Sequence, residues 1–325
     1  MNLHLIPRLK KSMNKTNSII SLLKIKGFGN VKVKSLLEFI GNDQYDNSKD
    51  LQNLISEFSE KVKKTKIPSI NELEIAIDNS KMIIDECLNK NINIIDYSDS
   101  DFPNSLKSIN NGPVILYTKG NKKLINNEKL ICIIGTRQPT KTAIKLGENL
   151  SQTVIDNNYK IVSGLALGCD TIAHKTSVNN DSETIAVLPS SVEEVYPKEN
   201  RELANKILDK NGLIISEYEP GSTVTKNKYI ERNRIVSGIS KGVCVIQCNV
   251  KSGTMRTVDI AIKQNKKIGA INYSFTNEIS EYEGNNFLIN KSNYSLGNKD
   301  EILDFLKSLD DLETKNSNFI QTELF

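Results

Sequence analysis

Short apolar runs, separated by polar or glycine-containing turns, dominate the chain from about residue 90 onwards. They have the length and composition of strands that are buried on both faces. The runs are residues 92–96, 114–118, 130–135, 159–162, 184–188, 213–216, 243–247 and 267–271. Segments of helical length lie between several of them, at 141–156, 170–178, 199–210 and 254–265. This alternation predicts an α/β fold with a Rossmann-like, doubly wound, mostly parallel sheet, whose ligand lies beyond the carboxyl ends of the strands.

Residues 18–40 have a different pattern, with apolar residues at helical spacing on both sides of a Gly-Phe-Gly at 27–29. This predicts two short helices joined by a tight glycine turn. The pair resembles a helix-hairpin-helix or SAM-like unit, in which hairpin amides can face a phosphate. A purely structural corner between two helices fits the same residues. We therefore expect a small all-helical module at 1–70, a Rossmann-like domain at 71–290, and an acidic helix and tail at 291–325.

Composition narrows the class of protein. With 325 residues, 38% hydrophobic and 25% charged, the chain is typical of a globular protein. No apolar run approaches the roughly 18 residues that span a bilayer, and the N-terminus has no signal-peptide pattern. Five cysteines without a CxxC pair predict reduced thiols in a cytoplasmic protein. Only two histidines are present, so we expect no His-rich zinc site, no metal and no cofactor.

Charge is distributed unevenly along the chain. Residues 1–70 carry 13 Lys and Arg against 6 Asp and Glu, whereas the last 35 residues carry 4 against 7. A basic first segment suits a polyanionic partner. A solvated lysine surface is the commoner explanation of such an excess.

Four of the predicted turns have residues that suit phosphate, at 135–140, 163–170, 229–238 and 251–254. Turns that open a helix offer free backbone N–H groups, and small residues let the backbone approach a ligand. Arg137 adds a planar guanidinium that matches phosphate. Arg232 and Arg234 lie two residues apart on a predicted helix, so one can point at a ligand while the other braces a neighbouring loop or carboxylate.

The same turns also allow a catalytic interpretation, which their residues support less well than phosphate binding. Cys169, Asp170 and His174 are close enough in sequence to suggest a cysteine hydrolase, with Asp170 and His174 able to pair across one helical turn. Asp170 also suits a helix cap, and a buried free cysteine is usually inert. No GxGxxG follows the first strand of the alternating region, and no GxxxxGK[ST] is present. The pattern therefore favours binding over catalysis.

Six ordered segments carry a family resemblance: IIGTRQPT, IVSGLALGCDTIAH, TIAVLPSSVEEVYPKENRELA, GLIISEYEPG, ERNRIVSGIS and KSGT. Together they resemble the DNA-processing protein A family (DprA, also called Smf), over roughly residues 18–290. The resemblance implies a non-catalytic, homodimeric protein that binds and protects single-stranded DNA. It also implies that the protein assists loading of the RecA recombinase in DNA uptake, natural transformation (competence) and recombination.

The resemblance also implies which residues contact DNA. The expected DNA- or phosphate-binding residues are Gly135, Thr136, Arg137, Ser163, Gly164, Arg232, Asn233, Arg234, Lys251, Ser252 and Gly253. Arg137 and Arg232 are the two from which we expect the strongest DNA contacts.

Several positions depart from the family pattern. Tyr229 and Ile230 stand where the family has Phe-Pro, and Glu231 stands where it often has a basic residue. A carboxylate beside a phosphate groove predicts weaker binding at this edge. Arg256 is an added arginine, and too few residues follow 290 for the family's C-terminal winged-helix-like module, so we expect the chain to lack it.

Two other functions stay open. A phosphoribohydrolase acting on nucleoside monophosphates has a related fold, but its PGGxGTxxE stretch is missing here. A nucleotide sensor in defence against foreign DNA would use the same pocket.

The last five residues suggest a further partner. Gln321, Leu324 and Phe325 have the Q-x-x-L-F form of peptides that dock on the replicative sliding clamp, with a glutamine amide and two apolar anchors. An arbitrary chain end fits the same residues.

Overall fold

The computed structural model describes residues 14–41, 47–62, 65–274, 281–292 and 294–322. Its contacts divide the chain into two compact units. The first comprises residues 1–102 and 110–115, and the second comprises 103–109 and 116–325. This division differs from the boundary at residue 70 that we expected from the sequence. Among the described residues, no helix is long and apolar enough to cross a membrane.

The first unit is mostly helical. Its elements are α1 (Lys15–Lys24), α2 (Asn30–Ile40), α3 (Ser48–Lys61), α4 (Ile70–Asn89) and β1 (Asn93–Asp96). Helix α4 packs along α1, and the buried Ser21 hydroxyl of α1 donates to Ser80 of α4 at 3.0 Å. Strand β1 also packs against α1, where the Thr16 hydroxyl donates to Asp96 at 2.5 Å. These contacts explain why α4 and β1 group with the helices of the first unit.

The predicted pair of helices around residues 27–29 is confirmed as α1 and α2. Gly27 adopts a φ of 97°, a left-handed conformation that favours glycine. The hairpin's contact with a phosphate stays a prediction.

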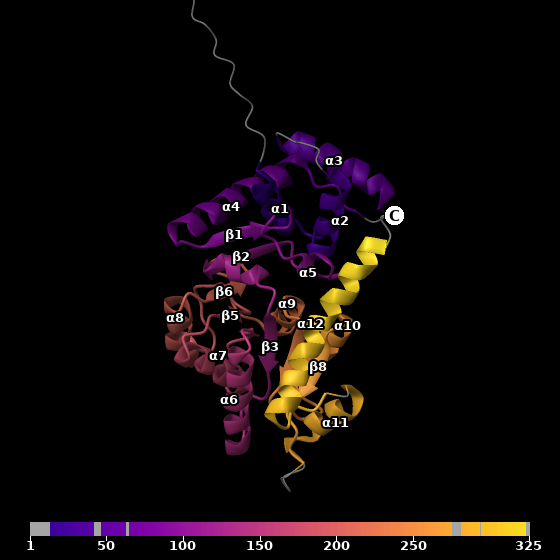
Figure 1. Cartoon of the computed structure of the whole chain (residues 1–325). Helices are drawn as coiled ribbons and strands as arrows, with labels where there is room; N and C mark the ends of the chain where they lie inside the picture. Colours follow the sequence, from indigo (N-terminus) through magenta and orange to yellow (C-terminus); the bar gives the residue numbers. More distant parts are fainter. Residues whose placement is uncertain (1–13, 42–46, 63–64, 275–280, 293, 323–325) are drawn as a thin grey trace, which may run out of the picture. The chain divides into compact units, whose positions relative to one another are not determined.

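Seven strands of the sheet belong to the second unit (Figure 1). They are β2 (Ile115–Gly120), β3 (Leu130–Ile134), β4 (Lys160–Ser163), β5 (Thr184–Val187), β6 (Leu213–Ser216), β7 (Gly242–Val245) and β8 (Lys267–Ala270). Their order is β2-β6-β5-β4-β3-β7-β8, and all neighbours are parallel except β2, which runs antiparallel to β6. The predicted doubly wound, mostly parallel sheet is therefore confirmed.

Longer helices connect these strands. They are α6 (Lys141–Asp156), α7 (Cys169–Asn179), α8 (Arg201–Asp209), α9 (Lys226–Gly238), α10 (Gly253–Lys263), α11 (Glu283–Ser292) and α12 (Lys299–Thr322), with shorter turns α5 (Asn104–Lys107), η1 (Lys122–Asn126) and η2 (Lys198–Asn200). From β3 to β6 the chain winds in one direction, and α9 then returns it to β7 beside β3. Right-handed crossovers in opposite directions place α6, α7 and α8 on one face and α9 and α10 on the other. The carboxyl ends of β3 and β7 flank this reversal, which is where doubly wound sheets bind ligands.

The acidic helix expected within 291–325 is α12, which begins at Lys299. Its Phe305 and Leu309 are buried in the same cluster as Leu150 and Val154 of α6. The Tyr159 hydroxyl donates to the Leu306 carbonyl at 3.2 Å. The start of this helix is therefore part of the second unit's core.

His174 ties α7 to the sheet. Its Nδ1 lies 2.9 Å from the Thr184 hydroxyl of β5, and that hydroxyl donates to the Ile161 carbonyl of β4 at 2.7 Å. Since the hydroxyl proton is used in this second bond, Nδ1 of His174 is the donor in the first. Burial, with the charge of Arg232, lowers the pKa of His174 from 6.5 to about 3. The imidazole is therefore neutral at physiological pH and holds α7 in place.

This buried imidazole predicts a pH dependence of stability. Between pH about 6.5 and about 3, the unfolded chain binds a proton at residue 174 that the folded chain does not. The free energy of unfolding should therefore fall as the pH is lowered through this window, by at most about 1.4 kcal/mol per pH unit. Urea unfolding from pH 7.5 to 5 measures the slope. For His174→Gln, the free energy of unfolding should depend less steeply on pH. Equal pH slopes for the two proteins would contradict a neutral, buried His174.

Candidate functional site

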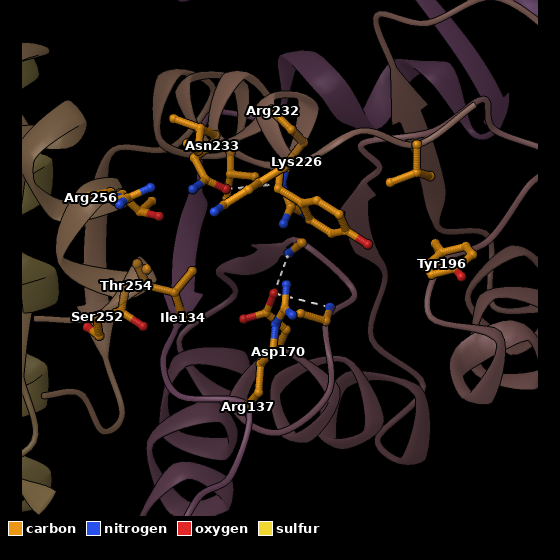
Figure 2. A pocket seen from close by; sticks show the side chains of 18 of the residues that line it. Ile134, Arg137, Asp170, Tyr196, Lys226, Arg232, Asn233, Ser252, Thr254 and Arg256 are labelled. Carbon is orange, nitrogen blue, oxygen red and sulfur yellow. Dashed lines mark hydrogen bonds between the residues drawn. The ribbon is translucent and has the colours of Figure 1, made fainter. Parts of the chain in front are cut away.

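The four segments expected to suit phosphate meet at one pocket of about 990 Å³ in the second unit (Figure 2), although residues 229–238 belong to helix α9 and do not form a turn. β3 and β7 are parallel neighbours, and β4 and β5 follow on the other side of β3, so the carboxyl ends of these strands lie at one edge of the sheet. Eight of the residues expected from the sequence line the pocket: Gly135, Thr136, Arg137, Gly164, Arg232, Asn233, Ser252 and Gly253. Segments more than a hundred residues apart in sequence thus form a single site.

The turn after β3 is held tightly on both sides. The Thr136 N–H donates to the Gln247 carbonyl at 2.7 Å, and the Thr136 carbonyl accepts from the Cys169 N–H at 3.0 Å. A Cβ on Gly135 would lie 2.5 Å from the Cys169 sulfur, so only glycine fits there. Thr140 caps α6 by accepting from the Ala143 N–H at 3.1 Å.

Arg137 projects from this rigid turn and is exposed. Its guanidinium carbon lies 5.3 Å from the centre of the Tyr229 ring of α9, a cation–π contact. This contact orients the guanidinium without using its N–H donors. Arg137 can therefore present those donors to an anion in the pocket.

Arg232 has a different environment, because only 6% of the residue is exposed. Its Nη1 donates to the Val187 carbonyl at the end of β5, at 2.6 Å, and its Nε donates to Asn233 at 3.2 Å. A Cβ on Gly164 would lie 1.9 Å from Nη1, so the guanidinium packs directly on the glycine backbone. Arg232 thus joins α9 to the ends of β4 and β5 and forms the floor of the pocket.

Asp170 completes this floor. One carboxylate oxygen accepts from the N–H groups of Gly164 at 3.1 Å and Ala166 at 3.3 Å (Figure 2). Burial raises the pKa of Asp170 and lowers the pKa of Arg232, and each group's charge opposes the shift of the other. From the sequence we expected Asp170 to cap α7. Instead, Gly168 is the N-cap, and the Asp170 carboxylate accepts from the amides of the preceding loop.

Cys169, Asp170 and His174, the residues of the cysteine-hydrolase hypothesis, do not form a catalytic triad. His174 contacts Thr184, and the recorded bonds of Asp170 go to loop amides. The Cys169 thiol is fully buried beneath Gly135, and burial raises its pKa. A thiol that is protonated and inaccessible is not a nucleophile.

Three expected residues do not line the pocket. Ser163 is buried, and its hydroxyl donates to the Ile133 carbonyl at 2.6 Å. Arg234 is buried and pairs with Glu217 at 2.5 Å, so the two arginines of α9 face different ways, as their spacing predicted. Lys251 is exposed next to the lining residue Ser252 but is not itself part of the lining.

The expected sliding-clamp residues cannot be placed. Leu324 and Phe325 lie outside the described residues, as does the side chain of Gln321.

Other lining residues were absent from the expected site, among them Glu194, Tyr196, Lys226 and Arg256. These four are exposed. Lys226 is the first residue of α9, and Arg256 lies in the first turn of α10, which Ser252 caps by accepting from the Met255 N–H at 3.3 Å. Basic residues in the first turn of a helix that follows a predicted strand are the signal that could have identified these two.

Glu231 is not among the lining residues, and it accepts from the Tyr218 hydroxyl at 2.6 Å. Its expected effect on binding stays a prediction. Tyr229 and Ile230, the other two departures at this edge, line the pocket, and Tyr229 contacts Arg137.

The charge of the lining favours anions. Arg137, Lys226 and Arg256 are exposed around the opening, and no ion pair is recorded for them within the described ranges. The lining carboxylates are Glu194, which is exposed, and Asp170, which is buried. Helices α9 and α10 also begin at the pocket, and their N-termini add positive potential. The arrangement suits a ligand with more than one phosphate.

Comparison with known proteins agrees with this architecture. Residues 93–307 match the model of the family described as DNA recombination-mediator protein A. DNA processing protein DprA of Bacillus subtilis is 33% identical over 201 residues, which cover 62% of this chain and 67% of that protein. DprA of Streptococcus pneumoniae is 35% identical over 183 residues, covering 56% of this chain and 64% of that protein.

Solved structures show the same similarity. The X-ray structure of DprA from Streptococcus pneumoniae superimposes with a TM-score of 0.73 at 29% identity, covering 90% of this chain and 98% of that chain. A structure of DNA processing protein A from Helicobacter pylori, described for its single-stranded DNA binding mode, gives a TM-score of 0.59 at 30% identity. It covers 67% of this chain and 95% of that chain. The chain therefore belongs to the DNA recombination-mediator protein A family, whose curated members carry the names DprA and Smf.

Proposed function

We propose that this protein binds single-stranded DNA in the pocket at the strand ends, by phosphate contacts and without breaking a bond. The observation that carries the proposal is the ring of exposed cations, Arg137, Lys226 and Arg256, around one open pocket. The Helicobacter pylori relative, whose structure is described for its single-stranded DNA binding mode, supports this choice of ligand.

Three separate cations suit a chain of phosphates better than a single anion. Each phosphate that a Lys or Arg neutralises releases condensed counterions, so affinity depends steeply on salt. The donors of Arg137 also match phosphate in geometry, because a guanidinium can form two parallel hydrogen bonds. The buried Arg232 adds positive charge beneath the pocket without itself being exposed.

Family membership supports a role in recombination. Within that role, we propose that the protein protects single strands and assists loading of the RecA recombinase, in DNA uptake and natural transformation. We also propose that it acts as a homodimer in the cytoplasm, and that the tail ending in Leu324 and Phe325 binds the sliding clamp.

A mononucleotide ligand is the alternative that the pocket's size supports. A volume of about 990 Å³ is at the upper end of what small-molecule sites occupy, roughly 300–1,000 Å³. A nucleotide sensor or a phosphoribohydrolase would use the same phosphate-binding groups. The two functions differ in whether the polymer binds more tightly than its monomer.

The first test is the salt dependence of binding to a labelled single strand. We expect affinity to fall steeply with salt, and Arg137→Ala to weaken binding about tenfold, because it loses a charge-assisted phosphate contact. The slope of log affinity against log salt should become shallower by about 0.7. Arg201→Ala is the matched control, because Arg201 is an exposed arginine that does not line the pocket. If Arg137→Ala left the slope unchanged, it would not contact phosphate.

The second test addresses the pocket floor. Gly164→Ala places a methyl group where the Arg232 guanidinium lies, so it should break the bond to Val187, lower the melting temperature and weaken binding to the single strand. Gly253→Ala is the control, because it also lines the pocket but has no atom within 4 Å of the added carbon. Thermal unfolding and filter binding measure the two effects. If the two variants had equal melting temperatures and equal affinities, the contact between Arg232 and Gly164 would not stabilise the pocket floor.

The third test separates the polymer from the mononucleotide. In a gel-shift series, unlabelled single strand should displace a labelled single strand at far lower phosphate concentration than duplex or nucleoside monophosphate. Incubation with monophosphates should release no free base. Tight mononucleotide binding would favour the sensor, and release of base would favour the phosphoribohydrolase.

A further inference from the structure

Tyr196 is an exposed aromatic residue at the edge of the pocket. It lies in the loop between β5 and η2, lines the pocket and is 45% exposed. Within the described part of the chain, no hydrogen bond, ring contact or cation contact of Tyr196 is recorded. An exposed aromatic ring in a ligand pocket, with no use inside the fold, points to a function in binding.

Other accessible aromatic rings have partners within the chain. Tyr229, also in the pocket, lies against the Arg137 guanidinium. Phe287 is 43% exposed, but the Lys291 ammonium lies 5.3 Å from its ring centre. The ring of Tyr196 differs from these rings because its exposed face is accessible to a ligand.

The loop that carries Tyr196 is anchored on both sides. The buried Ser190 hydroxyl donates to the Glu194 carbonyl, and the Ser190 carbonyl accepts from the Ser216 hydroxyl of β6 at 2.5 Å. After Tyr196, the Asn200 side chain donates to the Leu165 carbonyl at 2.9 Å. A ring on an anchored loop loses little conformational freedom when a ligand packs on it.

Charge divides the pocket into two parts. Glu194 lines it from the same loop as Tyr196, whereas the exposed cations Arg137, Lys226 and Arg256 come from other elements. Figure 2 shows Tyr196 on the opposite side of the pocket from Ser252 and Arg256. A carboxylate repels phosphate, so the side with Glu194 and Tyr196 suits an uncharged, planar part of the ligand.

We propose that the ring of Tyr196 stacks on a nucleobase of the strand whose phosphates contact the cations of the pocket. The inference rests on the proposed function and deepens it, because the ligand must then carry bases and not only phosphates. Stacking on an aromatic side chain contributes roughly 5- to 100-fold in affinity per base. Every base has a flat face, so this contact tolerates any sequence.

The test compares an oligothymidylate with an abasic oligonucleotide of the same length, which keeps the phosphates and lacks the bases. Tyr196→Ala should weaken binding of the oligothymidylate roughly 5- to 100-fold and leave binding of the abasic strand unchanged. Tyr196→Phe keeps the ring and should bind like the original protein. The salt slope should be the same for all three proteins, because no phosphate contact is lost.

One set of outcomes would overturn the stacking proposal, and another would overturn the proposed single-strand binding on which it rests. If Tyr196→Ala binds oligothymidylate normally, or weakens both strands equally, Tyr196 is not a stacking platform. If the original protein binds neither strand, the proposed function fails as well. A second measurement uses the unaltered protein: photo-crosslinking to a strand with 5-iododeoxyuridine should attach the base at Tyr196. Crosslinks that map only elsewhere would contradict the proposal.

Discussion

The buried guanidinium of Arg232 is the interaction on which the pocket depends. It bonds to the end of β5, packs on the Gly164 backbone after β4 and lies in the field of Asp170. Removing one partner of a buried charge pair typically costs about 3–5 kcal/mol, because the other charge is left without compensation. Arg232 therefore links α9, which carries Lys226, to the ends of β4 and β5 through contacts that are mostly buried.

This arrangement separates two functions that arginine performs in the chain. Arg232 and Arg234 lie in α9 and are both buried, one on the pocket floor and the other paired with Glu217. Arg137 and Arg256 are exposed around the opening. A guanidinium suits both environments because it stays charged when buried and offers several donors in a fixed plane. A rigid floor limits the conformational freedom that the pocket loses when an anionic ligand binds.

The residues that depart from the family pattern fit this scheme. Tyr229 lies beneath Arg137 and orients it, so its aromatic ring has a structural use in the pocket. Glu231 lies between the lining residues Ile230 and Arg232 but is not itself part of the lining, and its carboxylate accepts from the Tyr218 hydroxyl. A change of charge in a binding motif thus has little meaning until the direction of the side chain is known, since neighbouring residues on a helix face different ways.

The amino-acid sequence by itself determined the secondary structure and the edge of the sheet at which the site lies. Apolar runs and helical spacing are local, so the strand predicted at 130–135 appears at 130–134, and the helix predicted at 141–156 has those bounds. Parallel strands end at one edge of the sheet, so the predicted phosphate-binding turns that follow β3, β4 and β7 lie at that edge. Only the tertiary structure decided that β7 returns beside β3, that Asp170 ties a loop instead of capping α7, and that Lys226 and Tyr196 line the pocket. Burial and side-chain direction depend on partners distant in sequence, such as Val187 for Arg232, and local patterns carry no information about them.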